Sequence, residues 1–196
     1  NSRIVAPASG SGNFWYLELR SLKELEHRVS LEAEQMGLPL AFPEVGPQCV
    51  FGIELNTYAA ELARVTVWIG EIQWMLGHGY NPGKNPILKK LDQIDCRDAL
   101  LKHDGTKAAW PDVDAIIGNP PYLGNKKIIS ELGEDYVVTL RDAYKDNALS
   151  GADFVNYWFE QARSKFNEDK TLHVGFVATN SIRGGANREV IKRILN

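Results

Sequence analysis

The sequence predicts an α/β protein with a doubly wound, mostly parallel sheet. Short β-favouring runs alternate with helical patterns, residues 113–117 are apolar without alternation, and polar residues suited to chemistry follow the ends of strands. Strands that alternate with helices favour parallel pairing. An uninterrupted apolar strand is typical of a parallel sheet that is buried on both faces.

The expected elements follow from hydrophobic period and from Gly and Pro positions. Asn56 or Thr57 can cap the second helix, and we expect that helix to be well buried because it is apolar on most faces. Five strands are expected. Strands are expected at residues 3–6, 49–53, 113–117 and 172–178, and a weaker third strand is expected to end near residues 94–96. Helices are expected at 14–36, 57–76, 153–166 and 187–195, partly helical structure at 130–148, and a surface loop at 77–86.

Composition narrows the class of protein. The chain has 196 residues, enough for one domain with a real core, and its net charge of −3 argues against a chain that is a nucleic-acid-binding surface throughout. The two cysteines form no CxxC pair, which fits a reduced, cytoplasmic compartment. The four histidines lack metal-ligand spacing, so no metal site is expected. No signal peptide is visible, and no apolar run reaches the roughly 18 to 20 residues of a membrane span.

Two glycines, Gly10 and Gly12, lie between the first strand and the first helix. Glycines at this place let the backbone approach a ligand and present N–H groups at a helix N-terminus. A tight turn without a ligand explains them equally well. The third glycine of GxGxxG is missing, which disfavours a dinucleotide pyrophosphate.

Two carboxylates follow the next strands. Glu54 ends the second strand, where it can accept hydrogen bonds from both hydroxyls of a ribose; a solvated charge or helix cap is the alternative. Asp98 follows the third strand, where it can accept a hydrogen bond from an adenine amine; a surface Asp is the alternative.

The tetrapeptide Asn119-Pro120-Pro121-Tyr122 follows the fourth strand and is the most specific signal. Pro120 drives Asn119 into extended geometry, and Pro121 stiffens the next step. The Asn119 side chain and the Pro120 carbonyl offer two acceptors, and Tyr122 offers a ring for stacking. This set suits a planar group that bears an NH₂, although a rigid loop is the alternative.

These residues carry a family resemblance that covers nearly the whole chain. Residues 119–122 resemble the NPPY catalytic motif of S-adenosylmethionine (SAM)-dependent amino-methyltransferases, and residues 7–14 resemble the DPACGSGNF cofactor motif of adenine-N6 DNA methyltransferases. Residues 51–54, 97–100, 152–160 and 179–181 keep the family's motif order. The resemblance is to the large methyltransferases of restriction–modification and phage-defence systems.

The resemblance implies a Rossmann-like SAM-methyltransferase core over residues 1–196, expected to be part of a larger protein. It also implies that the sheet is incomplete, with the first five strands of the family. It implies transfer of a methyl group from SAM to N6 of a flipped-out adenine in double-stranded DNA, which domains largely outside this chain would bind. Neither a membrane nor a metal is implied. The implied catalytic residues are Asn119, Pro120, Pro121 and Tyr122, and the implied cofactor-binding residues are Pro7, Ala8, Gly10, Gly12, Asn13, Phe14, Glu54 and Asp98.

Two positions depart from the family pattern. Ala6 stands where the family has an acidic residue, and Ser9 where it has Cys. Three alternatives therefore stay open: an NPPY methyltransferase for protein glutamine or RNA guanine, a SAM-binding module without catalysis, and a structural subdomain that binds SAM only with its missing parts.

Overall fold

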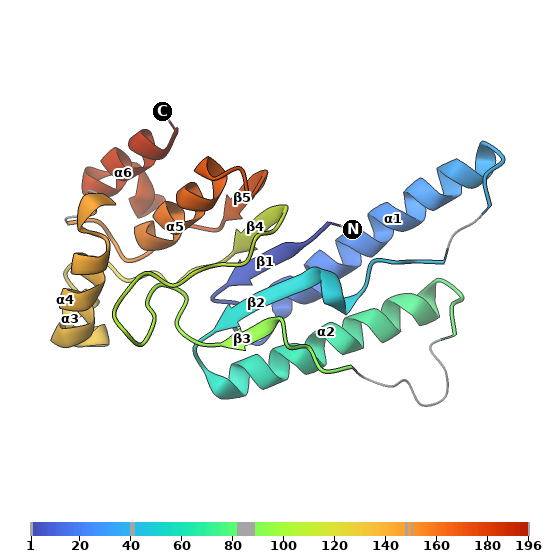
Figure 1. Ribbon diagram of the computed structural model, residues 1–196, viewed down its shortest axis with the longest axis horizontal. Helices are drawn as coiled ribbons and strands as arrows, with labels where there is room; N and C mark the ends of the chain where they lie inside the picture. The colour runs from blue at the N-terminus through green and yellow to red at the C-terminus, as the bar shows by residue number, and fades with distance from the viewer. Residues whose placement is uncertain (1, 40–41, 82–88, 148, 150, 196) are drawn as a thin grey trace. The chain divides into compact units, whose positions relative to one another are not determined.

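Short strands alternate with helices along the chain, which confirms the predicted α/β class with parallel strands (Figure 1). The computed structural model describes residues 2–39, 42–81, 89–147, 149 and 151–195. The chain divides into two units, Asn1–Arg97 and Asp98–Asn196. No helix within the described ranges is both long and apolar enough to cross a membrane.

The first unit is built on three parallel strands, β1 (Ile4–Pro7), β2 (Val50–Glu54) and β3 (Ile94–Cys96). β2 pairs with both of the others, with Pro7 opposite Ile53 and Glu54 opposite Cys96. The three carboxyl ends therefore meet at one edge, and the segments that follow β1 and β2 lie side by side. This edge is the place where open parallel sheets bind ligands.

Helix α1 (Asn13–Gln35) packs onto these strands through a close approach of Trp15 to Gly52. Trp15 is fully buried, and a Cβ added at Gly52 would lie 1.6 Å from its ring. The missing side chain in β2 is thus what makes room for the indole. Loss of a buried Trp side chain costs about 3–5 kcal/mol, so this contact is central to the core of the unit.

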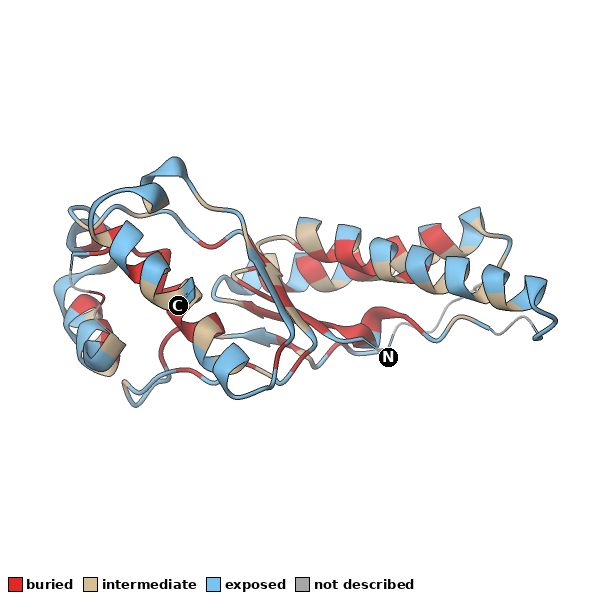
Figure 2. Cartoon of the chain, turned by 90° about the horizontal axis from the view of Figure 1, so that it is seen from above, coloured by how far each residue is buried: buried red, intermediate tan, exposed pale blue. Residues whose placement is uncertain are grey.

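Helix α2 (Thr57–Gly77) begins at the predicted cap, because Asn56 Oδ1 accepts a hydrogen bond of 3.0 Å from the N–H of Ala59. The expectation that this helix is well buried is wrong for one of its faces, and Figure 2 shows exposed residues along the long helices. Its sequence is apolar on opposite faces, and the described structure covers only one of them. The buried face carries Ala60, Ala63, Val67, Gly70 and Trp74, and the exposed face carries Tyr58, Leu62, Val65, Ile69 and Leu76.

A buried ion pair joins α1 and α2. Lys23 Nζ lies 2.9 Å from Glu71 Oε1, donates a hydrogen bond of 2.8 Å to the Val45 carbonyl, and sits 4.6 Å from the centre of the Trp74 ring. The predicted loop at 77–86 begins as expected where α2 ends, and its residues 82–86 lie outside the described ranges.

The second unit contains the parallel strands β4 (Ala115–Gly118) and β5 (His173–Phe176), with Gly118 opposite Phe176. Its helices confirm that residues 130–148 are partly helical. The elements are α3 (Ile128–Leu132), α4 (Glu134–Ala143), α5 (Asn156–Asn167) and α6 (Gly185–Leu195), with short 3₁₀ turns at Lys145–Asn147 and Asn180–Arg183; a further one, Pro47–Cys49, precedes β2 in the first unit.

Helix α5 begins three residues later than the sequence predicts. The Asp153 carbonyl accepts hydrogen bonds from the backbone N–H and the side-chain amide of Asn156, at 3.0 and 3.1 Å, so a turn precedes the helix. The backbone of Asp153 and Phe154 is bonded outside the helix, to Asn187 and Leu123.

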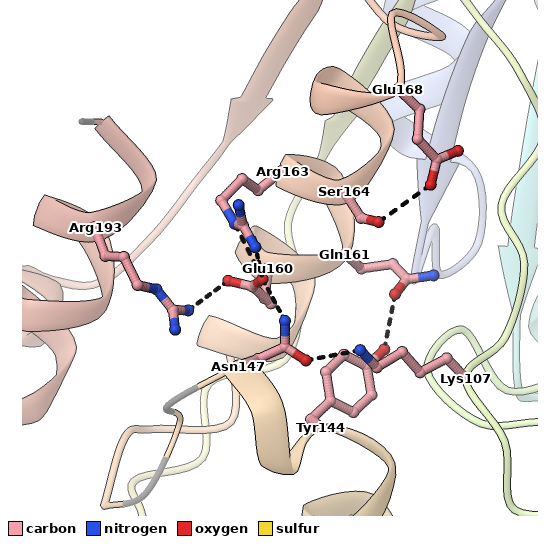
Figure 3. Close-up of polar contacts among 9 residues, drawn as sticks. All are labelled: Lys107, Tyr144, Asn147, Glu160, Gln161, Arg163, Ser164, Glu168 and Arg193. Carbon is pink, nitrogen blue, oxygen red and sulfur yellow. Dashed lines mark hydrogen bonds and ion pairs between the residues drawn. The ribbon is translucent and has the colours of Figure 1, made fainter.

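One buried carboxylate fixes α6 to α5 (Figure 3). Glu160 accepts hydrogen bonds from Arg163 on its own helix, Arg193 on α6 and the side chain of Asn147. Burial alone would raise the pKa of Glu160, but the hydrogen bond from Arg163 and the charges of both arginines lower it below its ordinary value. Glu160 therefore stays ionised and holds the two helices together.

Candidate functional site

The turn between β1 and α1 forms the first part of the site. Its backbone visits the left-handed region at Ala8, Gly10 and Gly12, with φ values of 65°, 58° and 89°. The N–H of Ala8 donates a hydrogen bond of 2.8 Å to the Ile53 carbonyl, and the N–H of Gly12 donates one of 3.2 Å to the Ser9 carbonyl. The turn is thus tied to β2 at its start and closed on itself before α1 begins.

Glycine is present at the two positions of this turn for different structural reasons. A Cβ at Gly12 would lie 2.9 Å from the Ala63 Cα, so Gly12 is required for the close packing of the turn on α2. A Cβ at Gly10 would meet nothing within 4 Å. Gly10 is therefore the one beside which the turn is open, and the structure accounts for Gly12 without any ligand.

Glu54 is held beside this turn. Its Oε2 accepts a hydrogen bond of 2.8 Å from the N–H of Gly10, and its Oε1 accepts one of 2.9 Å from the N–H of Asn56. The structure thus brings together two residues that the sequence singles out separately. A carboxylate has about four acceptor sites, so Glu54 is oriented by the backbone and can still accept further hydrogen bonds.

The other predicted cofactor-binding residues of the first unit belong to the elements that this turn connects. Pro7 is the last residue of β1, Asn13 is the first residue of α1 and is exposed, and Phe14 is half-buried. Ala6 is fully buried in the core of the unit together with Trp15. A small apolar side chain suits that place, where an unpaired carboxylate would be costly.

Asp98 lies at the start of the second unit, and its carboxylate is engaged there. Its Oδ1 accepts hydrogen bonds from the N–H groups of Leu100 and Leu101 at 2.7 and 3.3 Å, and its Oδ2 accepts one of 2.8 Å from the Tyr136 hydroxyl. Burial, and then Asp98, raises the pKa of Tyr136, so this hydroxyl remains a donor. Sequence reasoning missed Tyr136, which lies 38 residues further on and has no local signal.

Residues 119–122 leave β4 directly and form the second part of the site. Pro120 is buried, whereas Asn119, Pro121 and Tyr122 are exposed. Among the described residues, none donates a hydrogen bond to the Pro120 carbonyl, which agrees with its predicted role as an available acceptor. The extended backbone after β4 therefore presents the polar groups of Asn119 and Pro120 from a rigid, proline-locked segment.

The Tyr122 hydroxyl closes this segment onto the chain after β5. It lies 2.8 Å from the Val177 carbonyl oxygen and also hydrogen-bonds to Asn119 Oδ1. Burial raises the pKa of Tyr122, so the hydroxyl keeps the single proton that it shares between these acceptors. Val177 was not singled out by the sequence; the parallel pairing of β4 with β5 puts it there.

The two parts can do different chemistry. The turn and Glu54 offer a backbone approach and a carboxylate, a set that fits the ribose of a nucleoside cofactor. Asn119 and Pro120 offer carbonyl acceptors beside an exposed aromatic ring, a set that fits an NH₂ on a planar group. The roles of the individual residues stay predictions.

Comparisons with known proteins show the family of this chain. The whole chain, residues 1–196, matches the family described as "MmeI, DNA-methyltransferase domain". It is 26% identical over 196 residues to DNA methyltransferase A of Bacillus subtilis (strain 168), a match that covers 93% of this chain and 21% of that protein.

Two solved structures share the fold. One is the Type IIL restriction-modification enzyme MmeI in complex with DNA, with a TM-score of 0.65 and 21% identity, covering 99% of this chain and 27% of that one. The other is the ATP-dependent Type ISP restriction-modification enzyme LlaBIII bound to DNA, with a TM-score of 0.52 and 16% identity, covering 99% and 14%. The chain thus spans about a quarter or less of the length of these relatives.

Proposed function

Because this chain belongs to the MmeI DNA-methyltransferase domain family, we propose that it transfers a methyl group from SAM to the N6 amino group of adenine in DNA. The observation that carries the proposal is the pair of acceptors, Asn119 Oδ1 and the Pro120 carbonyl, at the exit of β4 beside Tyr122. The reaction would serve a restriction–modification or phage-defence system, as the described relatives support.

The proposed partner is double-stranded DNA. Both MmeI and LlaBIII were solved with DNA, and this chain covers 27% and 14% of them. A net charge of −3 does not favour a surface that grips DNA by itself. We therefore assign residues 1–196 the role of SAM-dependent catalytic core within a larger protein, whose other domains select the DNA site.

The first unit is proposed to hold the cofactor. SAM would supply an electrophilic methyl group on a sulfonium, and membership of a DNA-methyltransferase family supports its assignment here. Gly10 lets the backbone approach it, and Glu54, already oriented by the N–H groups of Gly10 and Asn56, accepts hydrogen bonds from the ribose hydroxyls. Asp98, the first residue of the second unit, keeps the assignment to the adenine amine of the cofactor that the family resemblance implies.

The second unit is proposed to hold the target base. The N6 group of adenine is not accessible for in-line attack within the stack, so the base must leave the duplex. Tyr122 stacks on it, while Asn119 and the Pro120 carbonyl accept the two N6 hydrogens. These contacts shift the nitrogen toward sp³ geometry and localise its lone pair as the nucleophile.

The chemistry balances without a strong general base before attack. The N6 nitrogen forms a bond to the methyl carbon as the bond from that carbon to sulfur breaks, and the nitrogen then releases one proton to solvent. Catalysis by these residues is positioning and electrostatic stabilisation. The rigid path through Pro120 and Pro121 serves that purpose because it fixes both acceptors before the base arrives.

The test is methyl transfer by the complete protein from labelled SAM, offered DNA, RNA and protein in parallel. We expect label in DNA, at adenine N6. We expect Asn119→Ala to abolish transfer while SAM binding, measured by calorimetry, stays near the wild-type value. Label in protein glutamine or RNA guanine would replace the adenine assignment, and unchanged methylation by the variant would remove Asn119 from the mechanism.

A further inference from the structure

Asp153 binds the segment that directly follows the Asn119–Tyr122 tetrapeptide. Its Oδ1 accepts a hydrogen bond of 2.9 Å from the N–H of Asn125, and the N–H of the next residue, Phe154, donates one of 2.9 Å to the Leu123 carbonyl. These two bonds hold residues 123–125 at both ends. Between them lies Gly124, the most permissive backbone in the segment.

Asn187, near the start of α6, orients Asp153 through hydrogen bonds to its other carboxylate oxygen and to its backbone. Its Nδ2 donates a hydrogen bond of 2.7 Å to Asp153 Oδ2, and its Oδ1 accepts one of 2.8 Å from the N–H of Asp153. Asn156 adds a third bond, from its side-chain amide to Asn187 Oδ1 at 2.8 Å. Asn187 is only 7% exposed and Asn156 is fully buried, so this network is shielded from competition with water.

The same asparagine reaches the chain that follows β5. Asn187 Nδ2 also contacts the Ser181 carbonyl at 3.1 Å, four residues after Val177, whose carbonyl binds the Tyr122 hydroxyl. The tetrapeptide is therefore anchored at its tyrosine to the segment after β5, and just downstream to Asp153. Asn187 contacts both anchors: it binds Asp153 directly, and it binds Ser181 in the segment after β5 that contains Val177.

We propose that Asp153, oriented by Asn187, is a positioning residue for methyl transfer. It fixes the downstream end of the catalytic segment, where proline stiffness ends and Gly124 begins, so that Asn119 and Tyr122 keep their geometry. The role rests on the proposed function of the tetrapeptide and adds a residue pair that does not touch the base. Losing about 1 Å of placement can cost on the order of a hundredfold in rate.

The structure provides a matched control at the other end of the same helix pair. Arg193 on α6 binds Glu160 on α5 at 2.6 Å and, like Asn187, ties the two helices together (Figure 3). Its hydrogen bond and its ion pair are both with Glu160, not with residues 119–125. Arg193→Ala should therefore weaken α5–α6 packing without releasing the catalytic segment.

The experiment measures kcat, the KM for SAM and the unfolding midpoint for the complete protein and four variants, one of which carries two substitutions. We expect Asp153→Ala to lower kcat about tenfold to a hundredfold while the KM for SAM stays near wild type. Asp153→Asn should lose activity, because the new side-chain NH₂ would face the NH₂ donor of Asn187. Adding Asn187→Asp to this variant should restore part of the activity, because the new carboxylate can accept from that NH₂. Arg193→Ala should lower the unfolding midpoint and leave kcat unchanged.

A second readout does not depend on activity. Hydrogen exchange at the Asn125 amide should become faster in Asp153→Ala and stay unchanged in Arg193→Ala. Wild-type kcat in Asp153→Ala, or an equal fall of kcat in Arg193→Ala, would overturn the positioning role. A wild-type protein that methylates no DNA would instead overturn the proposed function, and with it this role, so the two failures are distinct.

Discussion

The backbone N–H of Gly10 donates a hydrogen bond of 2.8 Å to Oε2 of Glu54, which joins the turn after β1 to the last residue of β2. The register of the two strands, with Pro7 opposite Ile53, is what brings them together. A second N–H, from Asn56, holds the other carboxylate oxygen at 2.9 Å. The carboxylate is thus fixed in place before any ligand binds, which lowers the entropic cost of using it.

Glu54→Ala is expected to weaken SAM binding. If the carboxylate accepts both ribose hydroxyls, its loss removes two charge-assisted hydrogen bonds and should raise the Kd for SAM by on the order of a hundredfold. Calorimetry with the complete protein measures this. Glu61→Ala is the control, because Glu61 is an exposed carboxylate on α2 that pairs with Arg64 on the same helix. An unchanged Kd in Glu54→Ala would remove the residue from the cofactor site.

The two glycines of the turn should respond differently to alanine. Gly12→Ala places a Cβ 2.9 Å from the Ala63 Cα, at a φ of 89°, and should destabilise the fold by about 1–3 kcal/mol. Gly10→Ala meets no neighbour within 4 Å, so only its φ of 58° is strained and the loss of stability should be smaller. Thermal unfolding measures both. Gly10→Ala should instead weaken SAM binding, and equal unfolding midpoints for the two variants would contradict the distinction.

What the sequence predicts well is local or follows from strand register. The order of strands and helices and the cap at Asn56 follow from period and capping chemistry. The placing of Gly10 and Glu54 after neighbouring strands follows from parallel topology, whereas the hydrogen bond between them comes from the structure. Asn119 and Tyr122 stand out as candidates because the two prolines between them are more than a simple turn requires. Their roles as catalytic groups stay predictions.

What the sequence does not predict depends on contacts between distant residues. Tyr136 reaches Asp98 across 38 residues, and Asn187 reaches Asp153 across 34, and no periodic pattern encodes either pair. The prediction that α2 is well buried was wrong on one face for a different reason. The hydrophobic period shows that the apolar residues Leu62 and Ile69 lie on one face of the helix. It does not show whether a neighbouring element covers that face.

Glu18, on α1, is buried without a partner. The side chain is 7% exposed, and neither carboxylate oxygen has a hydrogen-bond partner in the part of the chain that the structure describes. Burial raises the pKa of Glu18 from its ordinary value of 4.5 to about 8. The folded protein therefore holds a proton here at pH values at which the unfolded chain has released it.

This difference makes the stability of the protein fall as the pH rises from about 4.5 to about 8. In that window the folded state binds more protons than the unfolded state, so the free energy of unfolding decreases by up to about 1.4 kcal/mol per pH unit. Below the window Glu18 is protonated in both states and its contribution is constant.

Glu18→Gln keeps the shape of the protonated side chain and removes the titration. We therefore expect the variant to match the wild type near the acid end of the window and to exceed its unfolding midpoint near the alkaline end. Thermal unfolding of both proteins across this range measures the difference, in which other titrating groups cancel; parallel curves would show that Glu18 titrates normally in the folded protein.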